Sequence, residues 1–224
     1  MKPSILTMKN VYKSFQTMDL PTVILDNVSV VFEQNNSYAI QGVSGTGKST
    51  LIHILAGIEQ PSSGAVFFND RAITAMPESE HQFFLQHQVG LLFQQPYLIK
   101  ELTVLENICL PAMIAGKDRN DIQNQALELL DAVGLIHKQH EKPATLSGGQ
   151  QQRIALARAL INKPVFIIAD EPTGNLDLTT GKIIVELLIS LQKHWQMGLI
   201  ISTHDAYVAH AMNYTYRLED GRLH

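Results

Sequence analysis

One stretch of the chain has the spacing of a phosphate-binding loop. Residues Gln41–Thr50 read QGVSGTGKST and fit the pattern G-x-x-x-x-G-K-S/T at every fixed position. Its glycines permit backbone angles closed to other residues, so that backbone amides can surround an anion. Lys48 would place a charge on the outer phosphates, and the Ser49 hydroxyl suits Mg²⁺. We expect the nucleotide phosphates to be bound by Gly42, Val43, Ser44, Gly45, Thr46, Gly47, Lys48, Ser49 and Thr50.

Two other apolar runs also end in chemically useful side chains. Val165–Ala169 is followed by Asp170 and Glu171, and Leu199–Ile201 is followed, after two hydroxyl residues, by His204. Such runs are typical of parallel strands that are buried on both faces. Ligands of parallel α/β sheets collect outside the carboxyl ends of the strands. We therefore expect these side chains and the phosphate loop to meet at one edge of a sheet.

Each of these polar groups has a role that suits nucleotide chemistry. Asp170 would help to hold Mg²⁺, usually through water, together with Ser49 and the amide of Gln94. Glu171 would polarise the attacking water as general base. His204 would hydrogen-bond the γ-phosphate. An acidic pair can also be merely solvated and a histidine merely structural, but their combination in this order favours a catalytic site.

A second glycine-containing motif precedes a helix. Residues Leu146, Ser147, Gly148, Gly149 and Gln150 come before a helical pattern over 151–161. The serine is a good N-cap, and the two glycines expose backbone amides at the start of a helix. The motif is either a simple capped turn or a second phosphate site. A second site makes sense if a dimer holds each nucleotide between the loop of one chain and the helix of the other.

The remaining pattern predicts an α/β fold: a P-loop NTPase core with a mostly parallel sheet, an N-terminal antiparallel β subdomain and an inserted α-helical subdomain. Short strands are expected between residues 5 and 32, interrupted at Asp19-Leu20-Pro21. One helix of the insert should start at Asn120 or Asp121 and end at Gly134. We predict one domain over 1–224, with the core at about 1–93 and 161–224 and the helical part at about 94–160.

Composition narrows the class of protein. With 224 residues and 45% hydrophobic residues, the chain can form one large domain with a substantial core. A net charge of −4 gives no bulk attraction to nucleic acid. The single cysteine, Cys109, permits no internal disulfide, and we expect it to be a small buried hydrophobe. Residues 1–7 have no long apolar core, so we expect no signal peptide, and no apolar run approaches a membrane span.

Taken together, these motifs resemble those of the ATP-binding cassette ATPases over essentially the whole chain. The resemblance makes 42–49 the Walker A loop, 165–170 the Walker B strand, Leu146–Gln150 the signature used across a dimer, and 174–177 the D-loop that includes Asp177. It makes Glu171 the catalytic glutamate, Gln94 the Q-loop residue and His204 the switch histidine. It also implies that Phe15 stacks on adenine, with Tyr12 as a less favoured choice.

Within that family the chain is most similar to the short stand-alone ATPases of the lipoprotein-releasing and macrolide-export type, followed closely by cell-division ATPases. The marks include Phe93-Gln94-Gln95 and the run from Ala169 to Asp177. A departure at Gln34–Ser37, where such chains usually place a Gly-Glu turn, concerns turn geometry and not the site. The resemblance implies an ATPase that uses ATP and Mg²⁺, acts as a homodimer and is held at the cytoplasmic face of the inner membrane.

The implied partners are polytopic inner-membrane permease subunits, LolC/LolE-like or MacB/FtsX-like. Residues 94–115 would face them, where Pro96, Leu98 and Leu102 either present apolar surface or belong to the subdomain core. A regulatory ATPase without cargo is a second interpretation that the residues do not separate from transport. Nucleic-acid-handling members of the family carry a long coiled-coil insertion, which this chain lacks, and a P-loop kinase would lack the signature and the switch histidine.

Overall fold

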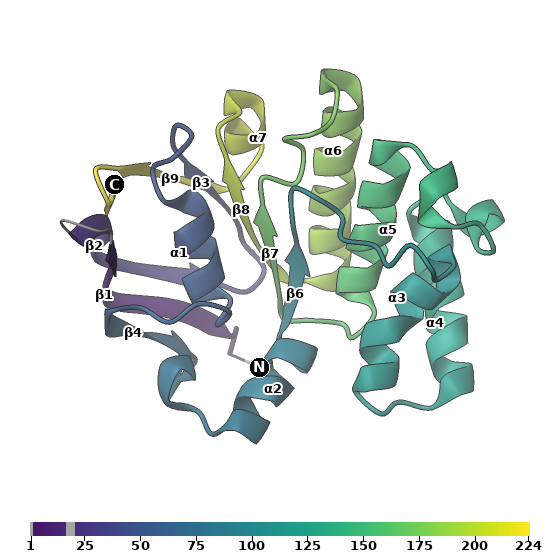
Figure 1. Ribbon diagram of the computed structural model, residues 1–224, viewed down its shortest axis with the longest axis horizontal. Coiled ribbons are helices and arrows are strands. Elements are labelled where there is room, and N and C mark those ends of the chain that lie inside the picture. Colours follow the sequence, from purple (N-terminus) through teal and green to yellow (C-terminus); the bar gives the residue numbers. More distant parts are fainter. Residues whose placement is uncertain (1, 17–20) are drawn as a thin grey trace.

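A computed structural model describes residues 2–16 and 21–224 and arranges them around two sheets. Figure 1 shows a four-stranded antiparallel sheet on the left, a six-stranded sheet in the middle and a group of helices on the right. This is the α/β architecture that the sequence predicts. The first sheet has the strand order β2-β1-β4-β5 and consists of β1 (Ile5–Gln16), β2 (Pro21–Glu33), β4 (Ser63–Phe68) and β5 (Arg71–Ala72).

The second sheet is mostly parallel and has the order β10-β9-β3-β8-β7-β6. Strands β3, β6, β7, β8 and β9 run parallel to their neighbours, and β10 closes an antiparallel hairpin with β9. The sheet consists of β3 (Ser37–Gln41), β6 (Val89–Leu92), β7 (Phe166–Asp170), β8 (Gly198–Thr203), β9 (Tyr214–Glu219) and β10 (Arg222–Leu223).

Apolar cores cover both faces of this parallel sheet. Ile167 and Ala169 point to the core shared with the helices on the right of Figure 1, and Phe166 and Ile168 point to the core shared with α1 and the antiparallel sheet. This alternation follows from the two-residue period of a strand. It also explains why β7 is apolar at both odd and even positions.

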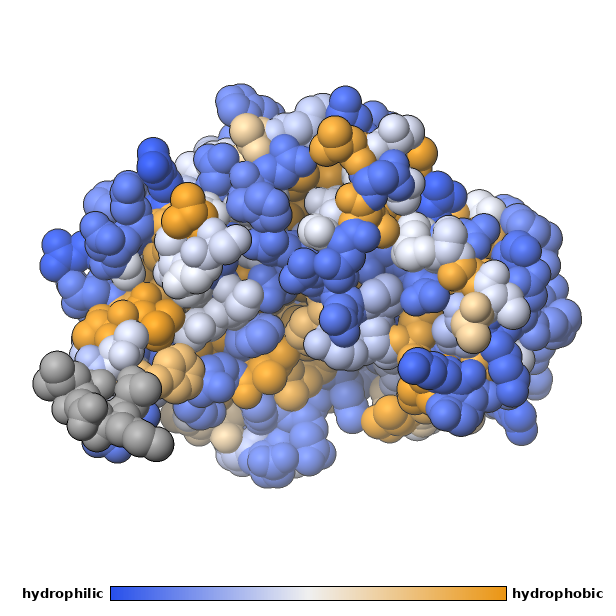
Figure 2. Space-filling view, turned by 45° about the horizontal axis from the view of Figure 1, so that its top comes forward, coloured by the Kyte–Doolittle hydropathy of each residue, from blue (hydrophilic) through white to orange (hydrophobic). Residues whose placement is uncertain are grey.

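Seven α-helices connect the strands in the described part of the chain. They are α1 (Lys48–Leu55), α2 (Glu78–His87), α3 (Val104–Ile114), α4 (Arg119–Ala132), α5 (Gly148–Leu160), α6 (Leu178–Trp195) and α7 (Ala206–His210), with short 3₁₀ turns at Ile73–Ala75, Ile136–Lys138 and Pro143–Thr145. None of the helices in residues 2–16 and 21–224 combines the length and the hydropathy that crossing a bilayer requires. Figure 2 shows a mainly hydrophilic face on which apolar residues form separate small patches.

The N-terminal β region differs from the sequence prediction in one respect. Instead of several short strands, it contains two long ones whose pairing shifts register between Met8 and Val11. Asn10 and Asn27 adopt left-handed backbone angles there (φ 48° and 54°), and their side chains are hydrogen-bonded at 2.8 Å. These two asparagines are therefore irregularities within long strands and not boundaries between short ones. Asp19 and Leu20 of the predicted interruption lie outside the described residues.

All elements assigned between β6 and β7 are helical, in agreement with the predicted helical insert, whose boundaries remain a prediction. The start of α4 was predicted wrongly. Asp118, and not Asn120 or Asp121, is the N-cap, because its carboxylate accepts hydrogen bonds from the backbone N–H groups of those two residues (2.9 and 3.4 Å). The helix ends as expected, with Gly134 at φ 72°.

Cys109 is buried in α3, as predicted, with 8% of its surface exposed. Desolvation by burial, with a smaller contribution from Glu106, raises the pKa of its thiol. A raised pKa keeps the sulfur protonated at neutral pH, and the thiol form is not the nucleophile. The cysteine therefore serves as packing in this helix.

The close approach of β6 to α5 gives a prediction for stability. A Cβ at Gly90 would lie 2.4 Å from the Ala159 carbonyl oxygen and 2.6 Å from Ile167 Cδ1. We expect Gly90→Ala to lower the free energy of unfolding by about 1–3 kcal/mol through overpacking, measured by urea denaturation. Gly181→Ala in α6 is the matched control, because its nearest neighbour is 3.5 Å away and alanine favours a helix by about 0.5–1 kcal/mol. Equal unfolding midpoints for the two variants would contradict the packing argument.

Candidate functional site

The loop between β3 and α1 is shaped by its glycines. Gly45 and Gly47 have φ values of 85° and 96°, in the left-handed region that favours glycine. A Cβ at Gly47 would also lie 2.6 Å from Ile24 Cγ2. Gly47 caps α1 without a side-chain hydrogen bond, so the first N–H groups of this helix remain available at the loop. The geometry is that of an anion-binding loop at a helix N-terminus.

Lys48 lies inside this loop and is 4% exposed. Its ammonium donates to the carbonyl oxygens of Gly42 (2.9 Å) and Val43 (3.1 Å) and forms an ion pair with Glu171 Oε1 (3.0 Å). A buried ammonium requires such partners because its desolvation is costly. The contact joins the phosphate loop directly to the end of β7.

Glu171 lies at the centre of the polar network. Its second carboxylate oxygen contacts His204 Nδ1 at 2.9 Å, and its backbone N–H donates to the carbonyl and the hydroxyl oxygen of Ser202 (3.1 and 3.0 Å). The residue has φ 43°, an uncommon value for a residue with a side chain. Strained conformations of this kind cost about 1–3 kcal/mol and cluster at functional sites.

Asp170, the last residue of β7, is held by neighbours that the sequence analysis did not assign. Oδ1 accepts a hydrogen bond from the Ser202 hydroxyl at 2.5 Å, and Oδ2 lies 3.8 Å from His53 Nε2. Ser202 therefore orients both acidic residues from the neighbouring strand, β8. Its position directly before Thr203 and His204 at the end of a buried strand is the signal that could have identified it.

Gln94 lies in the segment that follows β6. Its amide donates to Asn175 Oδ1 at 3.1 Å, and a Cβ at Gly174 would lie 2.8 Å from its nitrogen. The segment after β6 is thus in direct contact with the segment after Glu171. Asn175 belongs to the Gly-Asn-Leu-Asp sequence that we singled out, but its contact with Gln94 was not foreseen.

An open cavity of about 450 Å³ brings Gln94, Glu171 and His204 together with six of the nine predicted phosphate-loop residues; Gly42, Val43 and Thr46 of the loop and the predicted metal ligand Asp170 do not line it. Its lining comes from β2, from the phosphate loop and α1, and from the segments after β6, β7 and β8: Ile24, Ser44, Gly45, Gly47, Lys48, Ser49, Thr50, Gln94, Glu171 and His204. Phe15 is not among them. It lies near the end of β1, 45% exposed, with the Lys13 ammonium 4.8 Å from its ring centre. The adenine-stacking role of Phe15 stays a prediction.

The predicted signature motif lies at the exposed start of α5. Ser147 and Gln150 form a reciprocal capping box, with the Gln150 N–H donating to Ser147 Oγ (3.3 Å) and the Ser147 N–H to Gln150 Oε1 (3.0 Å). The motif does not line the cavity of its own chain. It packs against the D-loop and α6 instead, because Cβ atoms at Gly148 and Gly149 would lie 3.5 Å from Leu176 Cδ2 and 2.3 Å from Thr180 Cγ2.

Asp177, the last residue of the D-loop, is the N-cap of α6. Its carboxylate accepts hydrogen bonds from the N–H groups of Thr179 (3.1 Å) and Thr180 (3.0 Å). The side-chain and backbone hydrogen bonds from Thr180 lower the pKa of Asp177. The carboxylate therefore stays ionised at the positive end of the helix.

The oxygen donors near the cavity fit a hard cation better than a soft one. No group of three or more His, Cys, Asp or Glu that could enclose a metal occurs in the described ranges. Mg²⁺ keeps several waters and takes only one or two protein carboxylates. The Ser49 hydroxyl, exposed and without a hydrogen bond to any described residue, and the carboxylate of Asp170 match that requirement.

Comparisons with known proteins agree with this geometry. Residues 25–174 match the family model described as ABC transporter. The chain is 39% identical to the "Lipoprotein-releasing system ATP-binding protein LolD" of Saccharophagus degradans over 223 residues, covering 100% of this chain and 98% of that protein. It is also 39% identical to the protein of the same name from Acinetobacter baylyi over 222 residues, covering 99% and 97%.

Solved structures are similar over the same length. A dimeric bacterial ABC transporter cassette, MJ0796, superposes with a TM-score of 0.90 at 35% identity, covering 97% of this chain and 96% of the other. The same cassette in a dimeric post-hydrolysis state, bound to ADP and Pi, gives a TM-score of 0.89 at 34% identity with the same coverage. The similarity therefore extends through both sheets and the helical insert.

Proposed function

Because this chain belongs to the ABC transporter family, we propose that it is the ATP-hydrolysing subunit of a membrane transporter of the lipoprotein-releasing type. The observation that carries the proposal is the contact of Lys48 and His204 with Glu171 at the mouth of the phosphate loop. Relatives that bear the name LolD match the chain over its full length, which supports this type of transporter. A cell-division or regulatory ATPase is the alternative that the experiments below separate from it.

Hydrolysis would follow from a change of partners within the site. The triphosphate offers Lys48 a stronger counter-ion than Glu171, with which the ammonium pairs at 3.0 Å. Glu171 is then free to accept a hydrogen bond from the attacking water and to polarise it as general base. His204, whose Nδ1 lies 2.9 Å from the same carboxylate, would donate to the γ-phosphate once that contact loosens.

The chain offers a small set of ligands for Mg²⁺. We assign the Ser49 hydroxyl as a direct ligand, with Asp170 acting through water and the Gln94 amide near the cation. The ion, when bound, neutralises charge on the β- and γ-phosphates. The Ser202 hydroxyl donates to Asp170 Oδ1 and orients this carboxylate.

We propose that two copies of the chain share each nucleotide. The start of α5 is exposed at Ser147 and Gly148, and it lies outside the cavity of its own chain. Its free N–H groups would serve as phosphate ligands for a second copy. A dimeric arrangement has been described for the similar cassette MJ0796.

Ser147→Arg tests the shared site. We expect ATP affinity to be preserved, since this residue is outside the chain's own cavity, and turnover to fall at least about 100-fold because a preorganised donor group is lost. Phosphate release and ATP titration measure the two effects separately. Thr103→Arg is the matched control, because Thr103 forms an equivalent capping box at the start of α3, where no nucleotide contact is proposed. Full activity of Ser147→Arg would mean that the motif is an ordinary cap.

The proposed docking surface for the membrane partner is the segment 94–115. Of the two alternatives left open for Pro96, Leu98 and Leu102, Leu98 follows the second because it packs against the core, and Pro96 and Leu102 are partly exposed. Tyr97 (65% exposed) and Ile99 (39%) present apolar surface instead. The neighbouring Arg158 donates to the carbonyl oxygens of Pro96 (2.6 Å) and Tyr97 (2.7 Å).

Co-expression with permease subunits distinguishes a lipoprotein-releasing ATPase from a cell-division ATPase. We expect the tagged chain to co-purify with permease subunits of the lipoprotein-releasing type, at the cytoplasmic face of the inner membrane, and not with the permease of a cell-division system. Tyr97→Asp should lower the captured amount, because it places a charge in an apolar contact. Tyr214→Asp, which changes a 50% exposed tyrosine on β9, is the control. Capture of the cell-division permease alone would favour the regulatory alternative.

A further inference from the structure

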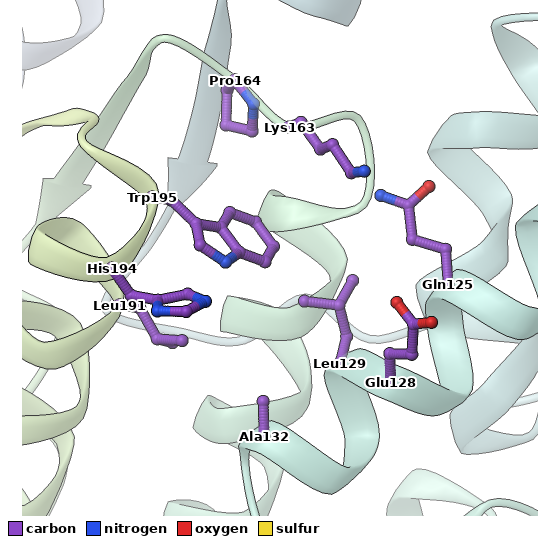
Figure 3. A pocket seen from close by; sticks show the side chains of 9 residues that line it. All are labelled: Gln125, Glu128, Leu129, Ala132, Lys163, Pro164, Leu191, His194 and Trp195. Carbon is purple, nitrogen blue, oxygen red and sulfur yellow. The ribbon is translucent and has the colours of Figure 1, made fainter.

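A second cavity, of about 460 Å³, lies far from the catalytic residues in the fold. It is bounded by α4, by the end of α6 and by the turn that leads into β7, so it lies at the amino end of that strand, whereas Asp170 lies at the carboxyl end. Figure 3 shows α6 side chains on one side of the space and α4 side chains on the other. None of its lining residues has a role in the function proposed above.

One part of this cavity is an aromatic and aliphatic surface. Trp195, the only tryptophan in the chain, lies beside Leu191 and across from Leu129. The indole is held at the last residue of α6, where Gln196 takes a left-handed conformation (φ 52°) and the buried Gln192 amide donates to the Met197 carbonyl at 2.9 Å. The indole itself is partly buried and packs against the core, so that its remaining surface offers a flat face for a ring.

The other part carries two opposite charges without partners. Neither Glu128 nor Lys163 forms an ion pair or a hydrogen bond with any residue in the described ranges, although both line the cavity. Gln125 donates to the Ile161 carbonyl at 2.7 Å, which fixes its amide and leaves its oxygen as a free acceptor. Figure 3 shows the carboxylate of Glu128 and the ammonium of Lys163 extending into the space opposite the indole.

We propose that this cavity binds a small zwitterion with a flat apolar ring, a compound of the aromatic amino-acid class. The ligand's ammonium would pair with Glu128, its carboxylate with Lys163, and its ring would pack on Trp195. Both side chains are exposed, so a ligand with only one charge would form one ion pair instead of two, and this difference gives the specificity. The proposal does not depend on ATP hydrolysis.

The position of Trp195 supplies the assay. Indole fluorescence of the full chain is titrated with L-phenylalanine, with 2-phenylethylamine, which has only the cation, and with 3-phenylpropionate, which has only the anion. We expect a saturable change with phenylalanine in the millimolar range, as suits a ligand of about twelve heavy atoms. The two singly charged probes should bind at least about fivefold more weakly, because each loses one charge-assisted contact.

Charge-neutral variants identify the contacts. Glu128→Gln should lower the affinity for phenylalanine to that for 3-phenylpropionate, and Lys163→Gln should lower it to that for 2-phenylethylamine. Glu186→Gln, an exposed glutamate on α6 that does not line the cavity, should change nothing. Thermal unfolding of each variant verifies that it is folded. The proposal is wrong if no probe gives a saturable fluorescence change, if all three probes bind with the same affinity, or if neither charge-neutral variant lowers the affinity for phenylalanine.

Discussion

Replacing Glu171 by Gln is expected to lower the ATP hydrolysis rate at least about a thousandfold while ATP still binds. General-base catalysis contributes about 10²–10⁴-fold, and glutamine cannot accept a proton at this position. The substitution keeps the shape of the side chain, but its single carbonyl oxygen can replace only one of the two carboxylate oxygens that contact Lys48 and His204. It also removes the negative charge that pairs with Lys48, so the lysine is released to the triphosphate at lower cost.

The same variant should accumulate as a dimer in Mg-ATP, because closure can no longer be reversed by hydrolysis. Size-exclusion chromatography with Mg-ATP and with Mg-ADP measures this directly, and phosphate release gives the rate. Glu186→Gln serves as the control for loss of a glutamate charge on the exposed side of α6. If Glu171→Gln remains a monomer in Mg-ATP, the shared nucleotide site must be abandoned.

Lys48→Ala is expected to abolish nucleotide binding, with a loss of affinity of at least about a hundredfold. Removing one partner of a buried, hydrogen-bonded charge pair costs about 2–5 kcal/mol. The ammonium is 4% exposed and is held at the mouth of the loop by two carbonyl oxygens, where a triphosphate would meet it. Calorimetric titration with ATP measures the loss.

The control for this variant is Lys193→Ala, which removes an exposed lysine near the far end of α6. The Lys48 variant also leaves Glu171 without its ammonium partner, so its unfolding transition is recorded to verify the fold. ATP binding by folded Lys48→Ala with the affinity of the unchanged chain would overturn the assignment of this loop.

The parallel sheet could be predicted because its strands have an unambiguous pattern. The run that becomes β7 is apolar at successive positions and ends in Asp170 and Glu171, so both its burial and its functional edge follow from the order of residues. The antiparallel strands were harder to delimit. Asn10 and Asn27 have low strand propensity, and only the partner strand shows that the chain continues through them with a bulge.

The prediction of helix starts is limited by a different ambiguity. Asp118, Asn120 and Asp121 are all good N-caps, and the apolar period that begins at Ile122 does not distinguish among them. The cap is set by the backbone conformation of Asp118, which is extended (φ −62°, ψ 138°). At Ser147 the predicted N-cap is confirmed, but the helix begins at Gly148 and not at Gln151, and Gln150 completes a capping box that the prediction did not use.

The side chains of the site could be identified individually, but their pairing could not. Motif spacing identifies Lys48, Glu171 and His204. It does not predict that Lys48 and His204 both contact the carboxylate of Glu171. Contacts between residues so distant in sequence depend on strand order and rotamers. The same is true of Gln94 and Asn175, and of Ser202, whose hydroxyl orients Asp170 from the adjacent strand.

Helix α5 joins two regions that would otherwise be separate. Its side chains Gln152 and Arg158 donate to the carbonyl oxygens of Phe93, Pro96 and Tyr97, and its first turn carries Ser147. The helix is 13 residues long, and the stretch after β6 is hydrogen-bonded along its side. In the assembly proposed above, a push on that stretch by the membrane partner would therefore tilt Ser147 toward or away from the second copy, so that mechanical load would set the timing of each catalytic cycle.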